Sequence, residues 1–383
     1  MSKLPFTECV EIVGSAVKRF EGEKKYVSTG AVERDHIDYS QVESVTYDKK
    51  PSRANLIADS GDVLFAKMQG TKKTIILDDD TSQNIFSTGF CAVRPIAERI
   101  SGRCLYHLLG SGYFLYQKDK FCSGATQKAI SNDGLKKIVI SVPDKAEQEK
   151  IADRLDKTDI VILKCQQILS VLNRLVRARF LEMFGDPVLN PKGWETALIR
   201  DIVTDVKYGT SRPSAESGKY PYLRMNNITY DGYLDLTELK RIDIPDNETE
   251  KCIARKGDVL FNRTNSAELV GKTCVFNEDE DMIIAGYIIR VRLKPVMLPV
   301  VLSCFMNTDA LKMKLKNMAK GAVNQANINA RELQDIEIYL PPQELQKRFS
   351  DFAEKTEKSK AAVKQTLEKA ETLKKALVQE YFG

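Results

Sequence analysis

The pentapeptide GDVLF occurs twice in this sequence of 383 residues, at residues 61–65 and again at residues 257–261. Two occurrences of five identical residues in the same order are improbable by chance. A Gly-Asp pair favours a tight turn and Val-Leu-Phe favours a buried strand, so we interpret the motif itself as framework. Its recurrence indicates that the chain contains two copies of one structural unit.

The similarity between the copies continues to the end of the chain. The dipeptide GA at residues 124–125 recurs at residues 321–322, and a strand-like alternation that ends at Pro143 recurs before Pro341. From there onward, identical residues reappear at a constant offset without a gap. An ungapped match of this length indicates duplicated structure.

Each copy ends in a segment typical of a long helix. The residues after positions 143 and 342 are rich in charge and contain no glycine or proline until residues 185 and 383. At ~1.5 Å per residue, roughly forty residues make a rod of about 60 Å. A single rod could be an ordinary packing helix, but two at equivalent places favour an antiparallel coiled coil. The predicted seam residues are Ile151, Leu155, Ile162, Leu169, Leu172 and Val176 in the first copy, and Phe349, Phe352, Val363, Leu367, Leu373 and Leu377 in the second.

The stretch GDPVLNPKGW at residues 185–194 concentrates glycine, proline and asparagine, which marks a linker between the copies. We predict an α+β fold with two mixed α/β domains in a pseudo-two-fold arrangement, joined by the two long helices. The predicted boundaries are 1–143 for the first domain, 144–185 for its helix, 186–193 for the linker, 194–341 for the second domain and 342–383 for its helix.

The composition argues against most enzyme classes. Eight cysteines lie scattered without a C-x-x-C pair, and there are only two histidines, so neither a zinc site nor a histidine-based hydrolase is expected. Residues 271–273 (GKT) resemble the end of a phosphate loop, but Ser266 stands where its first glycine is required. No signal peptide or membrane helix is indicated. We expect a cytoplasmic protein without catalysis or a metal of its own; a nuclease is the enzyme alternative.

Around GDVLF the framework repeats while the polar residues differ, KMQGTKKT in one copy and NRTNSAELVGKT in the other. Arg and Lys suit guanine and phosphate, and Asn and Gln suit adenine, so two related scaffolds could read two DNA sequences. The candidate DNA-binding residues of the first copy are Lys67, Gln69, Thr71, Lys72, Lys73, Gln127 and Lys128. Those of the second are Thr210, Ser211, Arg212, Arg224, Asn226, Asn227, Arg263, Asn265, Ser266, Lys272, Asn324 and Gln325, with Asn324 and Gln325 matched to Gln127 and Lys128.

In the order of its parts the whole chain resembles the specificity subunits of type I restriction-modification systems. The resemblance rests on KGWE at residues 192–195, on the two GDVLF motifs and on the two helices that open with P-x-x-x-x-Q. The first copy departs from it, because LPFTECVEIV at residues 4–13 replaces a KGWE-like start. The resemblance implies two target-recognition domains that each bind half of a bipartite double-stranded DNA target in the major groove, while the helices set the unread spacer.

The resemblance also implies partners. Two modification subunits would bind S-adenosylmethionine and methylate adenine after flipping the base, and two restriction subunits that use ATP and Mg can join. No cofactor is expected on this chain. The alternative function is a coiled-coil scaffold, or a DNA-binding subunit of another phage-defence system without restriction activity.

Overall fold

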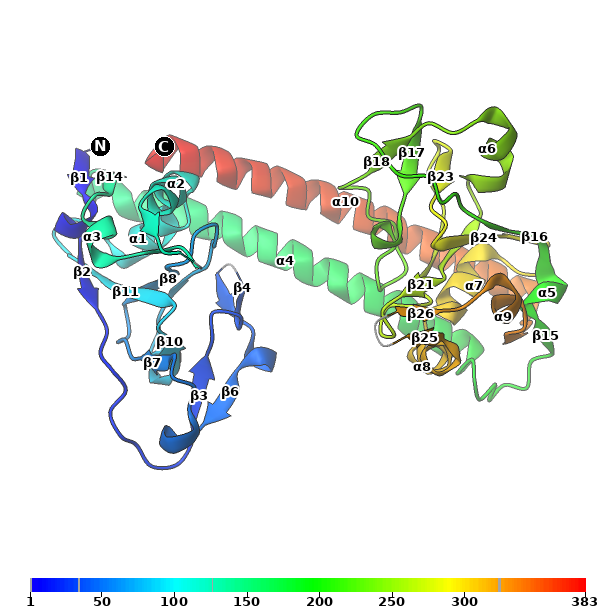
Figure 1. Ribbon diagram of the computed structural model, residues 1–383, viewed down its shortest axis with the longest axis horizontal. Coiled ribbons are helices and arrows are strands. Elements are labelled where there is room, and N and C mark those ends of the chain that lie inside the picture. The colour runs from blue at the N-terminus through cyan, green and yellow to red at the C-terminus, as the bar shows by residue number, and fades with distance from the viewer. Residues whose placement is uncertain (1, 34, 126, 323–324) are drawn as a thin grey trace. The chain divides into compact units, whose positions relative to one another are not determined.

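The computed structural model describes residues 2–33, 35–125, 127–322 and 325–383, and it divides into two units (Figure 1). Unit 1 comprises Met1–Gln166 and Gln365–Gly383, and unit 2 comprises Gln167–Lys364. Two helices of 40 residues each, α4 (Lys145–Phe184) and α10 (Gln343–Phe382), run without a break from one unit into the other.

Unit 1 contains two four-stranded sheets, in the orders β2-β11-β8-β9 and β6-β3-β10-β7. The first sheet consists of β2 (Val10–Val13), β11 (Phe90–Pro95), β8 (Val63–Ala66) and β9 (Thr74–Ile76), and the second of β6 (Glu43–Val45), β3 (Lys24–Val27), β10 (Ile85–Ser87) and β7 (Ala54–Leu56). Three short pairs are β1 (Ser2–Pro5) with β14 (Val139–Val142), β12 (Cys122–Ser123) with β13 (Ala129–Ile130), and β4 (Val32–Glu33) with β5 (His36–Ile37). The short helices are α1 (Gly102–Leu109), α2 (Gly112–Lys120) and α3 (Asn132–Leu135).

Unit 2 repeats this plan, with sheets in the orders β16-β24-β20-β22 and β18-β17-β23-β19. Their strands are β16 (Val203–Tyr208), β24 (Ile288–Leu293), β20 (Val259–Asn262), β22 (Thr273–Val275), β18 (Lys240–Ile242), β17 (Tyr220–Leu223), β23 (Met282–Ile284) and β19 (Ile253–Ala254). The smaller groups are β15 (Thr196–Leu198) with β27 (Glu337–Tyr339), and β21 (Thr264–Asn265), β26 (Gln325–Asn327) and β25 (Lys320–Ala322). The helices are α5 (Ile199–Ile202), α6 (Asp246–Cys252), α7 (Pro299–Met306), α8 (Asp309–Met318) and α9 (Ala330–Gln334).

The GDVLF motif builds the same corner in both units. Gly61 and Gly257 have φ values of +86° and +93°, which only glycine adopts without strain. The carboxylate of the buried Asp62 accepts two hydrogen bonds from Arg94, at 2.7 and 2.9 Å, and Asp258 accepts the equivalent pair from an arginine of β24. The Val-Leu-Phe residues are buried in both copies, so the interpretation of the motif as framework is confirmed.

The glutamine of each P-x-x-x-x-Q segment is buried and ties the start of a long helix to a short one. Gln148 accepts a hydrogen bond from the backbone N–H of Ser101 at 2.8 Å and donates to the carbonyls of Arg99 and Pro143. Gln346 does the same in unit 2, accepting from the N–H of Leu298 at 2.9 Å. This shared bond makes Ser101 and Leu298 equivalent, and so aligns α1 with α7.

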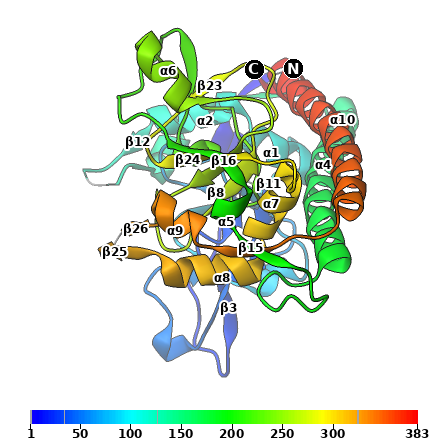
Figure 2. The same cartoon turned by 90° about the vertical axis from the view of Figure 1, so that its right-hand side faces the viewer.

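The long helices pair in opposite directions, as predicted. In unit 1 the first half of α4 meets the end of α10, where the guanidinium of Arg154 donates to the hydroxyl of Tyr381 at 2.8 Å. In unit 2 the end of α4 meets the beginning of α10, where Phe180 and Phe184 pack against Phe349 with ring centroids 5.6 and 5.4 Å apart. Both views show α4 and α10 side by side (Figures 1 and 2). The antiparallel coiled coil is therefore confirmed.

The prediction that Leu373 lies in the seam is wrong. Leu373 is 52% exposed, whereas its neighbours Ala370 and Tyr381 are buried. Lys374 takes the inward position and pairs with Asp159 of α4. Among the other seam residues, Ile151, Leu155, Val176 and Phe349 are buried, and Ile162, Leu169, Leu172, Phe352, Val363, Leu367 and Leu377 are half-buried.

Candidate nucleic-acid interface

In unit 1 the structure brings together two polar segments that are far apart in the sequence. The loop between β8 and β9, residues 67–73, lies against the segment before β13, because the N–H of Gln69 donates to the carbonyl of Lys128 at 3.0 Å. The side-chain amide of Gln127 donates to the sulfur of Met68 at 2.9 Å. Gln69, Gln127 and Lys128 are exposed, so these three candidate residues lie on one polar surface. We call residues 67–73 the first reading loop.

An arginine that the sequence analysis missed belongs to the same surface. Arg53 is exposed, and its guanidinium lies 3.5 Å from the side-chain oxygen of Gln127. The only signal in the sequence is the basic run KKPSR at residues 49–53. It adds a cation of the kind that contacts phosphate or guanine.

The corresponding segment in unit 2, residues 262–272, is longer, and we call it the second reading loop. Its Arg263 is equivalent to Lys67 of unit 1. The N–H of Arg263 donates to the carbonyl of Tyr287, and the N–H of Lys67 donates to the carbonyl of Gly89, each in the turn before the neighbouring strand of the sheet. The carbonyls of both residues accept a hydrogen bond from the N–H of an isoleucine. The guanidinium of Arg263 lies over the ring of Tyr208, 4.9 Å from its centroid. A basic side chain therefore stands at the same place in both units.

Three polar residues of the second reading loop, Asn262, Asn265 and Ser266, bond to one another. The side-chain amide of Asn265 donates to Asn262 at 2.8 Å, and its oxygen accepts from the backbone N–H of Ser266 at 2.9 Å. Asn265 and Ser266 are half-buried. These bonds hold the loop in one shape while part of each side chain remains accessible.

Two lysines that we predicted to contact DNA, the half-buried Lys73 and the buried Lys272, instead donate hydrogen bonds to backbone carbonyls of their own units. Lys73 donates to the carbonyl of Thr29 at 2.7 Å, and Lys272 donates to that of Met225 at 2.8 Å. Lys272 is only 6% exposed, and burial lowers its pKa. Thr29 and Met225 are each the second residue after equivalent strands, β3 and β17. A buried ammonium needs such acceptors, so this repeated lysine is framework.

Thr210 and Asn227 are further corrections, because both are buried and bonded internally. The N–H of Thr210 donates to the carbonyl of Ile284 at 2.9 Å, which extends the sheet. The side chain of Asn227 accepts from the N–H of Arg224 at 2.9 Å and donates to the carbonyl of Asp235 at 2.8 Å. Asn and Thr suit such local bonds as well as they suit bases, and residue type alone could not separate the two roles.

Two arginines of unit 2 have partners within the protein. Arg212 is exposed and makes two hydrogen bonds to Glu248, at 2.7 and 3.1 Å, and this pairing raises the pKa of the arginine. Arg224 is half-buried and donates to the carbonyl of Glu238 at 3.0 Å. Their neighbours Ser211 and Asn226 are exposed. In unit 1, Lys72 is exposed and Lys67 and Thr71 are half-buried.

The match between the polar segments near residues 127 and 325 shifts by one residue. Met68 pairs with Ala129, and Thr264, its counterpart, pairs with Asn327. Gln127 therefore corresponds to Gln325, whose side chain lies outside the described residues, as does Asn324.

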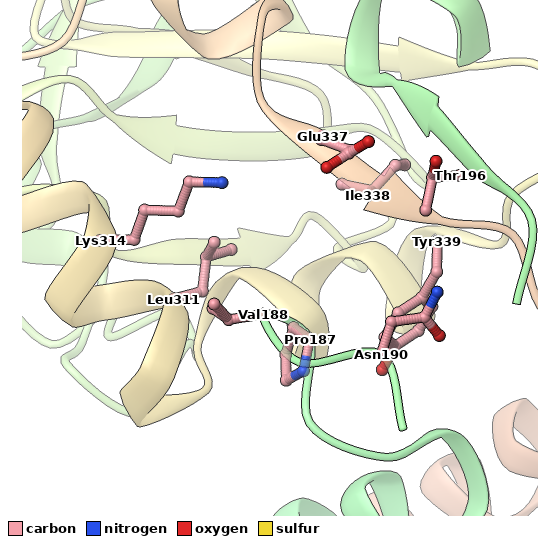
Figure 3. A pocket seen from close by; sticks show the side chains of 9 residues that line it. All are labelled: Pro187, Val188, Asn190, Thr196, Leu311, Lys314, Glu337, Ile338 and Tyr339. Atoms are coloured by element: carbon pink, nitrogen blue, oxygen red, sulfur yellow. The ribbon is translucent and has the colours of Figure 1, made fainter. Parts of the chain in front are cut away.

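No metal centre stands out in the described parts of the chain, and a pocket of about 210 Å³ in unit 1 is lined by residues that include Lys24, Asp59 and Asn84. Among the residues that the structure describes, no group of three or more His, Cys, Asp or Glu could hold a metal ion. A pocket in unit 2 lies between the linker, β15, β27 and α8, with Lys314 and Glu337 as its charged residues (Figure 3). Its volume of about 50 Å³ suits water rather than a substrate. No described helix is both long and apolar enough to span a membrane.

The fold and these surfaces define a class: a duplicated α/β protein that presents two polar loop surfaces on units joined by paired helices. Residues 11–174 and 191–372 both match the family model of the type I restriction modification DNA specificity domain. The chain therefore belongs to this family.

Known relatives agree with this assignment. The chain is 23% identical over 269 residues to the EcoKI specificity subunit of Escherichia coli K12, covering 66% of this chain and 58% of that protein. It is 24% identical over 220 residues to the HindI specificity subunit of Haemophilus influenzae, covering 56% and 47%. The chain thus spans about half the length of these relatives. A crystal structure of a type I restriction-modification S subunit from M. genitalium shares the fold, with a TM-score of 0.59 and 14% identity over 100% of this chain and 96% of that one.

Proposed function

We propose that this chain is the DNA specificity subunit of a type I restriction-modification complex, and that each unit reads one half of a bipartite target in double-stranded DNA. The observation that carries this proposal is the pairing of one framework with two different reading loops. Lys67 and Arg263 stand at the same place on equivalent backbones, but the residues that follow them differ in type and number. Arginine can bind guanine through two hydrogen bonds, whereas lysine acts as a point charge.

The chain itself would supply recognition and no catalysis. In this proposal it binds no cofactor: S-adenosylmethionine belongs to two modification subunits that methylate adenine, and ATP and Mg belong to restriction subunits that can join. The complex would work on genomic DNA in the cytoplasm. The helices α4 and α10, which connect the units, would set the number of unread base pairs between the two halves.

An exposed apolar stripe on α4 supports the recruitment of a partner. Ile168, Val171 and Leu175 are 45%, 51% and 45% exposed and recur at spacings of three and four, so they lie on one face of the helix. Soluble proteins rarely leave such a stripe uncovered. An amphipathic helix of the modification subunit would cover it. Changing Val171 to Glu should abolish co-purification with that subunit, whereas Ser170→Glu, at an exposed polar position, should not.

Selection of bound duplexes from a random pool tests the reading function. The chain, purified together with its modification subunits, should enrich two short defined sequences separated by undefined base pairs. Enrichment of one uninterrupted sequence, or of none, would overturn the proposal.

A further inference from the structure

A buried lysine lies directly beneath the first reading loop. Lys118 of α2 is 0% exposed, and its ammonium donates to three backbone carbonyls of this segment: Ala66 at 3.2 Å, Met68 at 2.8 Å and Thr71 at 2.9 Å. Its neighbour Asp119 accepts a hydrogen bond from the backbone N–H of Gly70 at 3.0 Å. Two consecutive side chains of one helix therefore hold the loop from below.

These contacts determine the path of the loop. A lysine has three N–H donors, and here all three carbonyl partners belong to residues 66–71. Burial lowers the pKa of Lys118, whereas the carbonyl acceptors and the carboxylate of Asp119, 3.5 Å from the ammonium, favour its charged form. Without the ammonium, three carbonyls would lose a donor, and the loop would be held only by its remaining bonds, such as those of Gly70 to Asp119 and of Gln69 to Lys128.

In unit 2 an uncharged residue stands at the position equivalent to Lys118. The helices α2 and α8 both begin after a hydroxyl cap, Ser111 and Thr308, and this aligns Lys118 with Leu315. Leu315 is buried and packs so closely on Gly271 that a side chain at this glycine would collide with it. At this position the second reading loop, which is longer, is therefore supported by the apolar side chain of Leu315 instead of by a lysine.

We propose that Lys118 is a positioning residue for the reading of the first half of the target. It contacts no DNA; it fixes the backbone from which Gln69 projects and against which Gln127 packs. This inference rests on the proposed function, since it concerns how one half of the bipartite sequence is recognised. It locates part of the specificity of unit 1 in a residue that is inaccessible to the ligand.

The test compares Lys118→Met with Lys120→Met in the complex with the modification subunits. Both changes remove one positive charge from α2, but Lys120 is exposed. Each complex selects duplexes from pools randomised in only one half of the target. Lys118→Met should reduce discrimination among first-half sequences about tenfold, the scale of one base contact, and leave the second half unchanged. Lys120→Met should change neither half.

Three controls separate the possible outcomes. If the wild-type complex shows no bipartite preference, the proposed function fails; if it does, and Lys118→Met keeps wild-type discrimination or loses both halves equally, only the positioning role fails. In Lys118→Met, backbone amide hydrogen exchange should be faster than in the wild type in residues 66–73 and unchanged in residues 262–272. Should Lys118→Met not fold, Asp119→Asn decides, with weaker discrimination confined to the first half supporting the role and an unchanged preference overturning it.

Discussion

The two units attach their sheets to the long helices with different chemistry. In unit 1, Arg103 of α1 forms ion pairs with Asp153 and Asp156 of α4, and the imidazole of His107 makes a hydrogen bond of 2.6 Å with Asp156. The equivalent positions of α7 in unit 2 are Val300 and Cys304.

Unit 2 instead uses the hairpin at residues 228–234, which begins five residues after β17, as the β4–β5 hairpin of unit 1 begins five residues after β3. Arg177 of α4 pairs with Asp231 at 2.5 Å, and the buried Lys360 of α10 lies 3.3 Å from the ring centroid of Tyr233. The two units therefore share their backbone geometry and its buried hydrogen bonds, whereas the charged contacts around that frame differ between them. We therefore expect the residues that differ between the units to determine which DNA sequence each unit reads.

The largest expected effect comes from the shared frame. Replacing Gln148 or Gln346 by Leu leaves one backbone N–H and two carbonyls without their partner, which should cost about 3 kcal/mol of folding free energy in each case. Urea unfolding of the two variants measures this loss. The exposed Gln167→Leu is the control. Unequal losses would show that the two frames are not equivalent.

The next effect should separate the units. Arg263→Ala should weaken binding of the correct second half-site by about 1 to 3 kcal/mol, the value of a bidentate base contact, and leave the first half-site unchanged. Lys67→Ala should act on the first half only. Titration of duplexes that carry a mismatch in one half measures both. An equal response of both halves to either variant would contradict separate reading.

Acid should affect unit 1 through His107. Burial lowers the pKa of this histidine below its ordinary value of 6.5, although Asp156 and Asp159 favour the proton and Lys374 opposes it. The folded chain therefore takes up this proton less readily than the unfolded chain, so stability falls as the pH drops below 6.5. His107→Cys, which installs the residue of unit 2, should remove this part of the pH dependence in thermal melts. A variant that melts in parallel with the wild type at every pH would refute it.

The smallest effect concerns the exposed pair in unit 2. Glu248→Gln frees Arg212 and removes a negative charge beside it. Affinity for unrelated duplex DNA should rise roughly twofold to fivefold, the scale of one exposed charge contact, with a steeper salt dependence. Glu354→Gln, at an exposed lysine pair on α10, serves as the control. If the salt dependence stays the same, Arg212 does not contact the DNA.

Much of the frame could be predicted from the sequence because duplication exposes it. The two GDVLF corners, the long helices and their opposite directions follow from residues that recur at fixed offsets. Leu373 was misassigned because its spacing also fits a heptad, and only the pairing of Lys374 with Asp159 shows which residue turns inward.

The interface was harder to predict, because residue type does not reveal which way a polar side chain points. Lys73 and Lys272 stand at equivalent positions of the two copies, and such repetition indicates framework. A lysine beside a polar loop nevertheless resembles a DNA-contacting residue until its carbonyl acceptor is known. Arg53 reaches Gln127, and Lys118 reaches the first reading loop, from distant segments of the chain. No local sequence pattern indicates such contacts.

The most direct test of the central claim is a map of methylated adenines in genomic DNA from a host that carries this chain and its modification subunits. The account predicts a motif of two defined parts with an undefined spacer, and a relaxation of only one part when Arg263 is changed to Ala. A single uninterrupted motif, or relaxation of both parts together, would contradict it.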